Sequence, residues 1–284
     1  RQVAEQLRED DELLILPDHE SDPVAKRTGL PASVSVIPVG DPDGCSGKAN
    51  AIAVGMERAR HDRLVWTDDD FEHPPDWLDQ LSADYDRQGP VSEVPFFRGR
   101  DALSVLLEPT NVFGGTLTTW AADIPWGGSV IFERGDLEVD AFRADLTRTI
   151  SDDGTLDEHL DVTSIRRVHE VSAGGTIHES LERFVRFIKI VRFHGPGITV
   201  FNALALLALT ALLVLYPVLT TVAVTLSYGI IYAAFGIRRW TFLLAVPATI
   251  LNLPLFAYAL ARRTFVWGGR RYRWRSMFDV EVVE

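Results

Sequence analysis

The sequence has 284 residues and a formal net charge of −12, a length that allows one large domain or two smaller ones. The charge is uneven, because residues 1–195 carry 37 acidic and 20 basic side chains while residues 196–284 carry 3 acidic and 8 basic. An acidic body with a basic, apolar tail argues against nucleic acid as a partner and suits a membrane surface, and the one cysteine excludes an internal disulfide.

The first half of the chain alternates between apolar runs and helical patterns. We predict strands at residues 11–17, 33–39, 64–66 and 91–97, and helices at residues 2–9, 48–59 and 76–81. Alternation of this kind is typical of a parallel, doubly wound α/β sheet.

Three carboxylates, Asp68, Asp69 and Asp70, directly follow the apolar run at residues 64–66. Ligands of open α/β sheets bind beyond the carboxyl ends of the strands, and alternation along extended backbone lets Asp68 and Asp70 point the same way. Two carboxylates there suit Mg²⁺ or Mn²⁺, with a substrate diphosphate completing the coordination. Taken alone, the triplet is equally typical of an acidic, solvated turn.

Two further polar segments are candidates for ligand binding. Residues 18–22 form a polar loop suited to a ribose or a base, and residues 126–132 form a glycine turn that leads into a strand. Gly127 and Gly128 let the backbone approach a ligand closely, although a tight turn needs the same residues.

Residues 151–160 are predicted to begin a helix, with Ser151 as its N-cap. Asp152 and Asp153 fall in the first turn. They are candidate proton acceptors, although acidic residues at this position also stabilise the helix dipole without any function.

The second half of the chain turns apolar. We predict a short strand at residues 168–173 and a basic helix at residues 179–193. Residues 195–237 contain no charged side chain, and 43 such residues are enough for two membrane crossings that turn near Tyr216 and Pro217. Residues 103–120 are too interrupted for a clear span and suit an interfacial helix or one that lies under the sheet.

A third apolar stretch, residues 241–261, contains Pro247 and Pro254 and is therefore expected to be kinked or re-entrant. Arginine clusters stand at residues 183–192, 238–239 and 262–275. A re-entrant third segment places all three on the cytoplasmic side, where basic residues concentrate, and we expect the catalytic domain to face the cytoplasm.

The order of these motifs resembles that of family 2 glycosyltransferases with the GT-A fold, and most closely the membrane-tailed branch that includes ceramide glucosyltransferase. The segments that carry the resemblance are the helix with Lys48 and Asn50, Asp68-x-Asp70, Gly127-Gly128, residues 152–156, residues 189–193 and residues 267–274. The composition also resembles that of salt-loving organisms, since only 3 of the 28 basic residues are lysines.

The resemblance implies roles for individual residues. Asp68 and Asp70 would hold Mg²⁺ or Mn²⁺ on the nucleotide diphosphate, and Asp153 would be the catalytic base. The remaining implied substrate contacts are Asp18 at the nucleoside, Lys48, Asn50, Asp69, Gly127, Gly128, Asp152, Lys189, Arg192 and Phe193. Lys189 and Phe193 replace the Gln and Trp of the family's Gln-x-x-Arg-Trp motif, and Lys189 and Arg192 are equally suited to anchor a helix at lipid headgroups.

The sequence therefore predicts an α/β protein with four parts. The first is a GT-A catalytic domain over residues 1–180, with a Rossmann-like, mostly parallel sheet that lacks the family's N-terminal strand. The others are a basic interfacial helix over 181–194, transmembrane or re-entrant helices over 195–262, and a basic tail over 263–284. The expected function is inverting transfer of a sugar from a nucleoside-diphosphate sugar to a lipid-linked or polyprenyl acceptor in the cell membrane. The alternative is a truncated or catalytically silent transferase fold that binds or scaffolds.

Overall fold

A computed structural model describes residues 2–283 of the chain and shows a mixed α/β protein with two compact units. The first unit consists of Arg1–Ser92, Pro125–Thr163 and Trp274–Glu284, and the second of Glu93–Ile124 and Ser164–Arg273.

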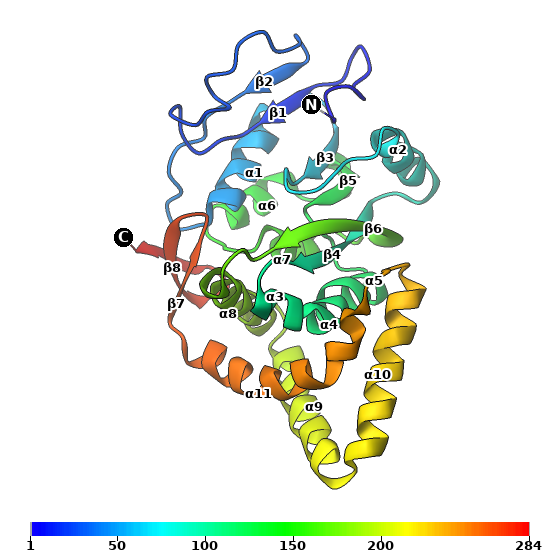
Figure 1. Ribbon diagram of the computed structural model, residues 1–284. Helices are drawn as coiled ribbons and strands as arrows, with labels where there is room; N and C mark the ends of the chain where they lie inside the picture. The colour runs from blue at the N-terminus through cyan, green and yellow to red at the C-terminus, as the bar shows by residue number, and fades with distance from the viewer. Residues whose placement is uncertain (1, 284) are drawn as a thin grey trace. The chain divides into compact units, whose positions relative to one another are not determined.

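The first unit contains most of the predicted strand and helix alternation (Figure 1). Its elements are β1 (Leu13–Ile15), β2 (Val34–Val36), α1 (Gly47–Arg58), β3 (Arg63–Thr67), α2 (Trp77–Gln88), the start of β4 (Val91–Gly99), β5 (Ser129–Glu133), the short 3₁₀ helix η2 (Arg134–Asp136), α6 (Val139–Leu146), α7 (Asp152–His159) and β9 (Asp279–Val283).

The sheets of this unit are mixed rather than mostly parallel. β1 and β2 pair in parallel, but β3 pairs antiparallel with β5, and β5 pairs antiparallel with the start of β4. The expectation of a mostly parallel sheet is therefore wrong for these strands. The pattern of alternating elements does not record strand direction, and β5 enters the sheet from the glycine turn at Gly127 with the opposite direction to β3.

The core of the first unit forms where α1, α6 and α7 cover the β3–β5 pair. The ring of Trp66 stacks on Phe142 at 5.7 Å between centroids and meets the edge of Phe132 at 5.2 Å. Phe142 and Phe132 are fully buried. These contacts fix the end of β3, and with it the position of the acidic triplet.

The helix predicted at residues 2–9 is wrong. Residues 2–6 form turns, and the side chain of Gln6 bonds to the loop before α2 and to the first turn of α2. Its Oε1 accepts from Leu78 N at 3.0 Å, and its Nε2 donates to Pro74 O at 2.8 Å. Tertiary hydrogen bonds override a weak helical pattern here.

The second unit contains the rest of β4 beside β6 and most of the apolar helices. Its elements are α3 (Ala102–Leu106), α4 (Glu108–Asn111), the π-helix η1 (Val112–Leu117), α5 (Thr118–Ala121), β6 (Thr163–Ala173), α8 (Ile177–His194), α9 (Pro196–Leu215), α10 (Pro217–Ala234), the 3₁₀ helix η3 (Trp240–Leu244), α11 (Ala245–Ala261), β7 (Thr264–Trp267) and β8 (Arg270–Ser276).

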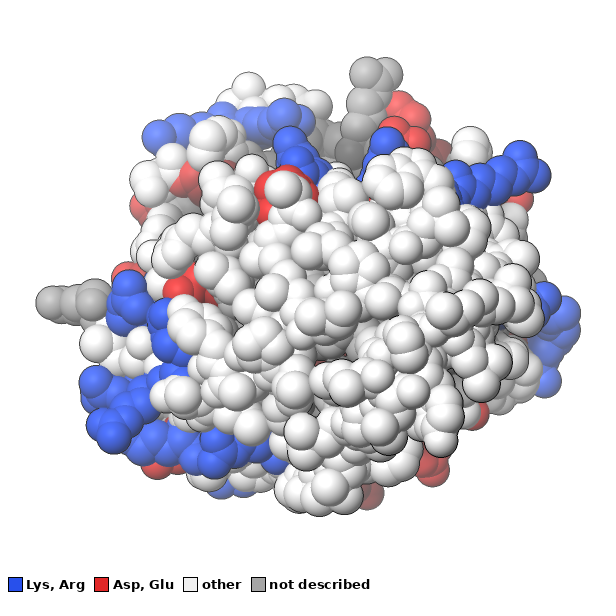
Figure 2. All heavy atoms as spheres, turned by 60° about the horizontal axis from the view of Figure 1, so that its bottom comes forward, with Lys and Arg blue, Asp and Glu red and all other residues white. Residues whose placement is uncertain are grey.

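Three of these helical segments are long and apolar enough to cross a membrane: Pro196–Leu215, Pro217–Ala234 and Trp240–Ala261. The helices α9 and α10 form the predicted hairpin, with Pro217 starting α10 directly after Tyr216. Seen with this hairpin forward, the surface is broadly free of charged side chains, with arginine or lysine at its edge (Figure 2). Proline is tolerated at the first turn of a helix, which explains why both helices begin with one.

The third segment differs from the hairpin. In Figure 1, α11 runs across the α9–α10 hairpin, and it packs against α8 and α9. Pro254 lies inside α11, where it removes one helical hydrogen bond. After α11 the chain forms an antiparallel β7–β8 hairpin through Gly268 and Gly269, both with positive φ, so this part of the predicted tail is a folded hairpin.

Candidate functional site

The predicted acidic residues meet where three elements of the first unit come together: the end of β3, the start of α1 and the start of α7. Both helices begin with a capping serine. Ser46 Oγ accepts from Ala49 N, and Ser151 Oγ accepts from Gly154 N, each at 3.0 Å. The N-cap predicted at Ser151 is therefore confirmed. Two helix starts point their positive dipole ends at one place, which favours negative charge there.

Lys48, in the first turn of α1, lies between two carboxylates. Its Nζ is 2.8 Å from Asp68 Oδ1 and 3.0 Å from Asp152 Oδ2, the second contact being an ion pair that is not aligned as a hydrogen bond. Burial lowers the pKa of Lys48, but Asp152, Asp68 and Asp153 together raise it well above its usual value. Lys48 is therefore a fully charged bridge between β3 and α7.

Asp153 stands beside this pair and is held by the glycine turn. Gly127 N donates to Asp153 Oδ1 at 2.7 Å. Burial, and then the neighbouring charge of Asp152, raise the pKa of Asp153 well above its usual value, against the opposing effects of Lys48 and of the Gly127 hydrogen bond. The shift is upward because the effects of burial and of Asp152 outweigh those of the nearby positive groups.

Gly127 is a glycine because no side chain fits at its position. A Cβ atom there would lie 2.5 Å from Asp153 Oδ1 and 2.6 Å from Asp152 Oδ2. At Gly128 a Cβ atom would lie 2.3 Å from the indole ring of Trp126. The two glycines thus allow the turn to pack against the carboxylates on one side and the tryptophan on the other.

The acidic triplet divides into one inner and two outer residues. Asp68 is half-buried in its pair with Lys48, whereas Asp69 and Asp70 are exposed in the loop that follows β3. Within residues 2–283 no three His, Cys, Asp or Glu side chains converge as a ready-made metal site. Mg²⁺ is commonly held by one or two carboxylates together with substrate phosphates, so Asp68 and Asp70 fit a metal that arrives with a diphosphate.

The predicted nucleoside contact, Asp18, follows β1 at the carboxyl edge of the β1–β2 pair. Gly40, which follows β2, donates its N–H to Asp18 O at 2.9 Å and accepts from Asn50 Nδ2 at 3.3 Å. Asp18 and Asn50 are therefore joined through one loop of the first unit. Asn50 lies on α1, two residues after Lys48, which connects this loop to the helix that holds the charged site.

The remaining predicted residues lie on α8 in the second unit. Lys189 is only 4% exposed, whereas Arg192 is exposed and Phe193 is half-buried. Burial, and the positive charges of Arg192 and Arg262, lower the pKa of Lys189. No carboxylate pairs with Lys189 in the described part of the chain, and the centre of the Phe193 ring lies 5.9 Å from its Nζ.

Sequence reasoning missed the support behind the glycine turn. Trp126 N donates to Ser92 Oγ at 2.8 Å, and the Trp126 ring lies 5.3 Å from Phe71. The signal in the sequence was a tryptophan directly before two glycines, because the Trp126 ring occupies the space that a side chain at position 128 would need. The bridge made by Lys48 was also missed, because it depends on three elements meeting in space.

Comparison with known families identifies the chain. Residues 29–278 match the profile of glycosyl transferase family 21, whereas no individual curated protein matches the sequence. The resemblance to a glycosyltransferase is thereby confirmed, with 21 in place of the expected family 2. Because the match spans most of the chain, including the charged site and the apolar helices, the protein belongs to glycosyl transferase family 21.

Proposed function

We propose that this protein is a membrane-embedded, inverting glycosyltransferase that moves a sugar from a nucleoside-diphosphate sugar to the hydroxyl group of a lipid acceptor. The observation that carries the proposal is the cluster of Lys48, Asp68, Asp152 and Asp153 at two helix starts and one strand end. Four charged groups gathered at one place in a glycosyltransferase domain are more than a stable fold needs.

Asp153 is proposed as the general base. Sugar transfer in one displacement needs a group that takes the proton of the acceptor hydroxyl as that oxygen bonds to the anomeric carbon, and such a displacement inverts this carbon. A base works best when its pKa lies near the working pH. The burial that raises the pKa of Asp153 moves it towards that range, and the Gly127 N–H fixes one of its oxygens.

Asp68 and Asp70 are proposed to hold Mg²⁺ or Mn²⁺ together with the donor diphosphate. Such a cation, when bound, stabilises the negative charge of the departing nucleoside diphosphate. Lys48 neutralises Asp68 and Asp152 in the free protein, and its ammonium group is proposed to contact the donor's phosphates. Asp18 and Asn50 are proposed to contact the nucleoside through their shared loop.

The apolar helices support a lipid-linked acceptor. The faces of α9 and α10 are exposed and apolar, with Phe201 69% and Val218 77% exposed, which is stable only in lipid or against another apolar surface. The course of α11 across the hairpin supports a re-entrant segment, which would leave Arg238–Arg239 and Arg262–Arg263 on the same side. By the preference of basic residues for that side, we propose that the catalytic unit faces the cytoplasm.

The test is nucleotide release and sugar transfer by the full chain in lipid nanodiscs. A panel of nucleoside-diphosphate sugars would be supplied with an extract of membrane lipids, in Mg²⁺, in Mn²⁺ and in excess chelator. We expect turnover only with a divalent metal. The double variant Asp68→Asn/Asp70→Asn should lose both the turnover and the metal-dependent binding of the donor.

The matched control is Asp140→Asn, which changes an exposed aspartate on α6 by the same charge. It should retain turnover and metal dependence. Full activity in chelator would refute the metal assignment. Binding of the donor without any turnover, with every donor and lipid tried, would favour the silent binding module over the enzyme.

A further inference from the structure

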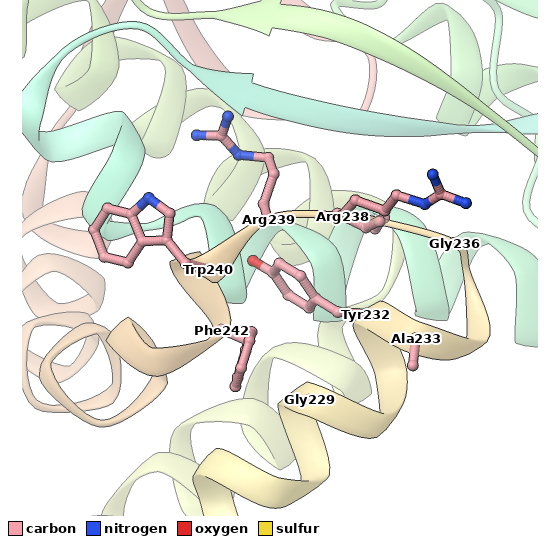
Figure 3. A pocket seen from close by; sticks show the side chains of 9 residues that line it. Gly229, Tyr232, Ala233, Gly236, Arg238, Arg239, Trp240 and Phe242 are labelled. Carbon is pink, nitrogen blue, oxygen red and sulfur yellow. The ribbon is translucent and has the colours of Figure 1, made fainter.

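The second unit contains a cavity of about 660 Å³ at the point where α10 ends and η3 begins (Figure 3). The residues that line it are Gly229, Tyr232, Ala233, Gly236, Ile237, Arg238, Arg239, Trp240 and Phe242. Gly229, Ala233 and Gly236 contribute no bulky side chain to the wall, whereas Tyr232 on α10 and Trp240 and Phe242 on η3 contribute aromatic rings. The cavity is part of neither the carboxylate cluster nor α8.

A buried ion pair fixes the loop that carries this cavity. Glu108 is fully buried and accepts from Arg239 Nε at 2.9 Å and Arg239 Nη2 at 2.8 Å. Thr241 Oγ1 donates to the same carboxylate at 2.5 Å and lies 3.3 Å from the hydroxyl of Tyr232. A bidentate ion pair with further hydrogen bonds holds the backbone of this loop in one geometry. The cavity wall is therefore preorganised before any ligand binds.

The next residue, Arg238, is not used by this network. It is exposed, and within residues 2–283 its guanidinium has no ion pair or hydrogen bond. In Figure 3 the side chain of Arg238 extends from the loop away from Trp240, while Arg239 points out of the cavity. Because Arg239 neutralises Glu108, the charge of Arg238 is left unbalanced at the rim.

The surroundings of the cavity are those of a membrane interface. It lies at the junction of two segments that are apolar enough to span a membrane. Trp240 is 61% exposed, and tryptophan concentrates at the level of lipid headgroups. Ile230 on α10 and Leu243 on η3 are 69% and 54% exposed, so acyl chains can lie directly below the rim.

We infer that this cavity binds the headgroup of an anionic phospholipid, with Arg238 on the phosphate and with Trp240 and the exposed face of α10 beside the acyl chain. The inference rests on the membrane embedding in the proposed function. It concerns a bound lipid that is not consumed in the transfer reaction. The argument for an anionic lipid is charge complementarity, since the lining contains two arginines and no carboxylate, and only Arg239 is paired, with Glu108 behind the wall.

The experiment is native mass spectrometry of the full chain released from nanodiscs that contain phosphatidylglycerol and phosphatidylcholine in equal amounts. We expect the wild-type protein to retain phosphatidylglycerol in preference to phosphatidylcholine. Hydrogen bonds to a charged group contribute about 1.5–3 kcal/mol, so Arg238→Gln should weaken retention of phosphatidylglycerol by about tenfold or more. A second variant, Ala233→Phe, fills the cavity without changing charge and should also reduce retention.

The matched control is Arg263→Gln, which removes an exposed arginine just after the other end of α11. If a basic surface simply attracts anionic lipid, both arginine variants should lose equal amounts of phosphatidylglycerol retention. If the cavity is a specific site, Arg263→Gln should reduce that retention by less than about twofold. Equal losses, or no preference for phosphatidylglycerol in the wild type, would overturn the inference. Displacement of the lipid by millimolar glycerol phosphate would also overturn it, since the site would then bind a free phosphate ester.

These outcomes are separable from failure of the proposed function. Washing membranes at alkaline pH should leave the full chain in the pellet, and its release would remove the basis of both proposals. Transfer activity in nanodiscs made only of phosphatidylcholine, with no lipid preference at Arg238, would leave the enzyme intact and refute the lipid site alone.

Discussion

The first unit contains a partly buried lysine, Lys48, and the second a buried one, Lys189, and the surroundings of the two lysines are opposite in charge. Lys48 in the first unit has three carboxylates around it, and their attraction raises its pKa. Lys189 in the second unit has no carboxylate partner in the described part of the chain, and burial together with Arg192 and Arg262 lowers its pKa. The first cluster has an excess of negative charge, whereas Lys189 lies near two arginines, of which Arg192 is exposed and Arg262 pairs with Glu182 at 3.0 Å.

Neither imbalance stabilises the fold, because like charges that gather without enough counter-charge cost free energy. An acidic cluster with too little counter-charge can take up a cation, and a buried lysine without a carboxylate partner can take up an anion. Each unit therefore contains a charged site of its own that is a candidate for ligand binding.

The largest effect is expected from Asp153→Asn. If the acidic cluster serves catalysis, loss of the base should reduce turnover on a hydroxyl acceptor by about 10²–10⁴-fold while the donor still binds, because the diphosphate is held by other groups. The same variant should raise the melting temperature, since it removes a partly buried carboxyl group whose ionised form is disfavoured by burial and by Asp152. Turnover, donor affinity and thermal unfolding of the variant would be compared with those of the wild type.

The comparison for that variant is Asp152→Asn. Asp152 pairs with Lys48, whereas Asp153 is held by Gly127, so the Asp152 variant should lose less turnover than the Asp153 variant. Near-wild-type turnover of Asp153→Asn on a hydroxyl acceptor would exclude Asp153 as the base. An acceptor that is already ionised, such as a polyprenyl phosphate, needs no base, and the effect would then be small.

The second prediction exchanges each lysine for methionine and expects opposite changes in stability. Lys48→Met leaves Asp68 and Asp152 without their partner, and removing one member of a buried pair typically costs about 3–5 kcal/mol; since Asp68 is partly solvated, we expect about 2–4 kcal/mol. Lys189→Met removes a buried, unpaired charge and should stabilise the protein by about 1–2 kcal/mol. Thermal unfolding in detergent checks both signs.

Measuring donor binding of these variants distinguishes a functional role of the lysine from its effect on stability. Lys189→Met should weaken donor binding although the protein is more stable, a trade-off common at functional sites. Lys189→Gln, which restores the residue expected from the resemblance, should retain more donor affinity than Lys189→Met. Destabilisation by Lys189→Met would show that the second cluster has a partner in the folded protein and would end the contrast between the two lysines.

The third prediction concerns the turn that holds the acidic cluster together. In Gly127→Ala the new Cβ would approach Asp153 Oδ1 to 2.5 Å, so the carboxylates must move. A displacement near the chemistry of about 1 Å can cost up to ~10²-fold, and we expect a loss of turnover of about tenfold. Gly135→Ala, at a glycine with no atoms within 4 Å of the added Cβ, is the control and should be silent.

Much of the first unit could be predicted from sequence because its local signals agree. The serine caps, the alanine-rich α1 and the apolar run of β3 specify their elements without tertiary help. Strand direction could not be predicted, since alternating elements do not show that β5 runs antiparallel to β3. The β7–β8 hairpin was missed, although consecutive Gly268 and Gly269 between two aromatic, basic runs are a strong signal for a tight turn.

The candidate site was also predictable from the sequence only in part. The meeting of Asp68, Asp152 and Gly127 follows from where strand ends and helix starts lie in α/β proteins, and the residue types were evident from the sequence. Two properties were not accessible. Both the bridge from Lys48 to α7 and the raised pKa of Asp153 depend on burial, which arises only when all three elements pack together.

The smallest expected effect distinguishes a structural carboxylate of the second unit, Asp101, from the proposed catalytic carboxylate of the first, Asp153. Asp101 caps α3, and five donors satisfy it: its Oδ1 accepts from Leu103 N and Ser104 N, and its Oδ2 accepts from Ser104 Oγ, Ser180 Oγ and Gly175 N. Burial alone would raise the pKa of Asp101, but these hydrogen bonds lower it to about 2. Its ionised form is therefore favoured by the fold, in contrast to that of Asp153.

Asp101→Asn should lower stability by about 1 kcal/mol, the usual contribution of a helix cap, and leave turnover unchanged. A carboxylate whose pKa is lowered on folding contributes its stability above the unfolded value near 4, and this contribution is lost as the pH falls towards 2. The difference in unfolding temperature between wild type and variant should thus be constant from pH 7 to 5 and shrink below pH 4. Asp76→Asn, at an N-cap whose side chain makes no capping bond, is the control and should change little. A loss of turnover in Asp101→Asn at unchanged stability would place Asp101 in the reaction and not in the framework of the second unit.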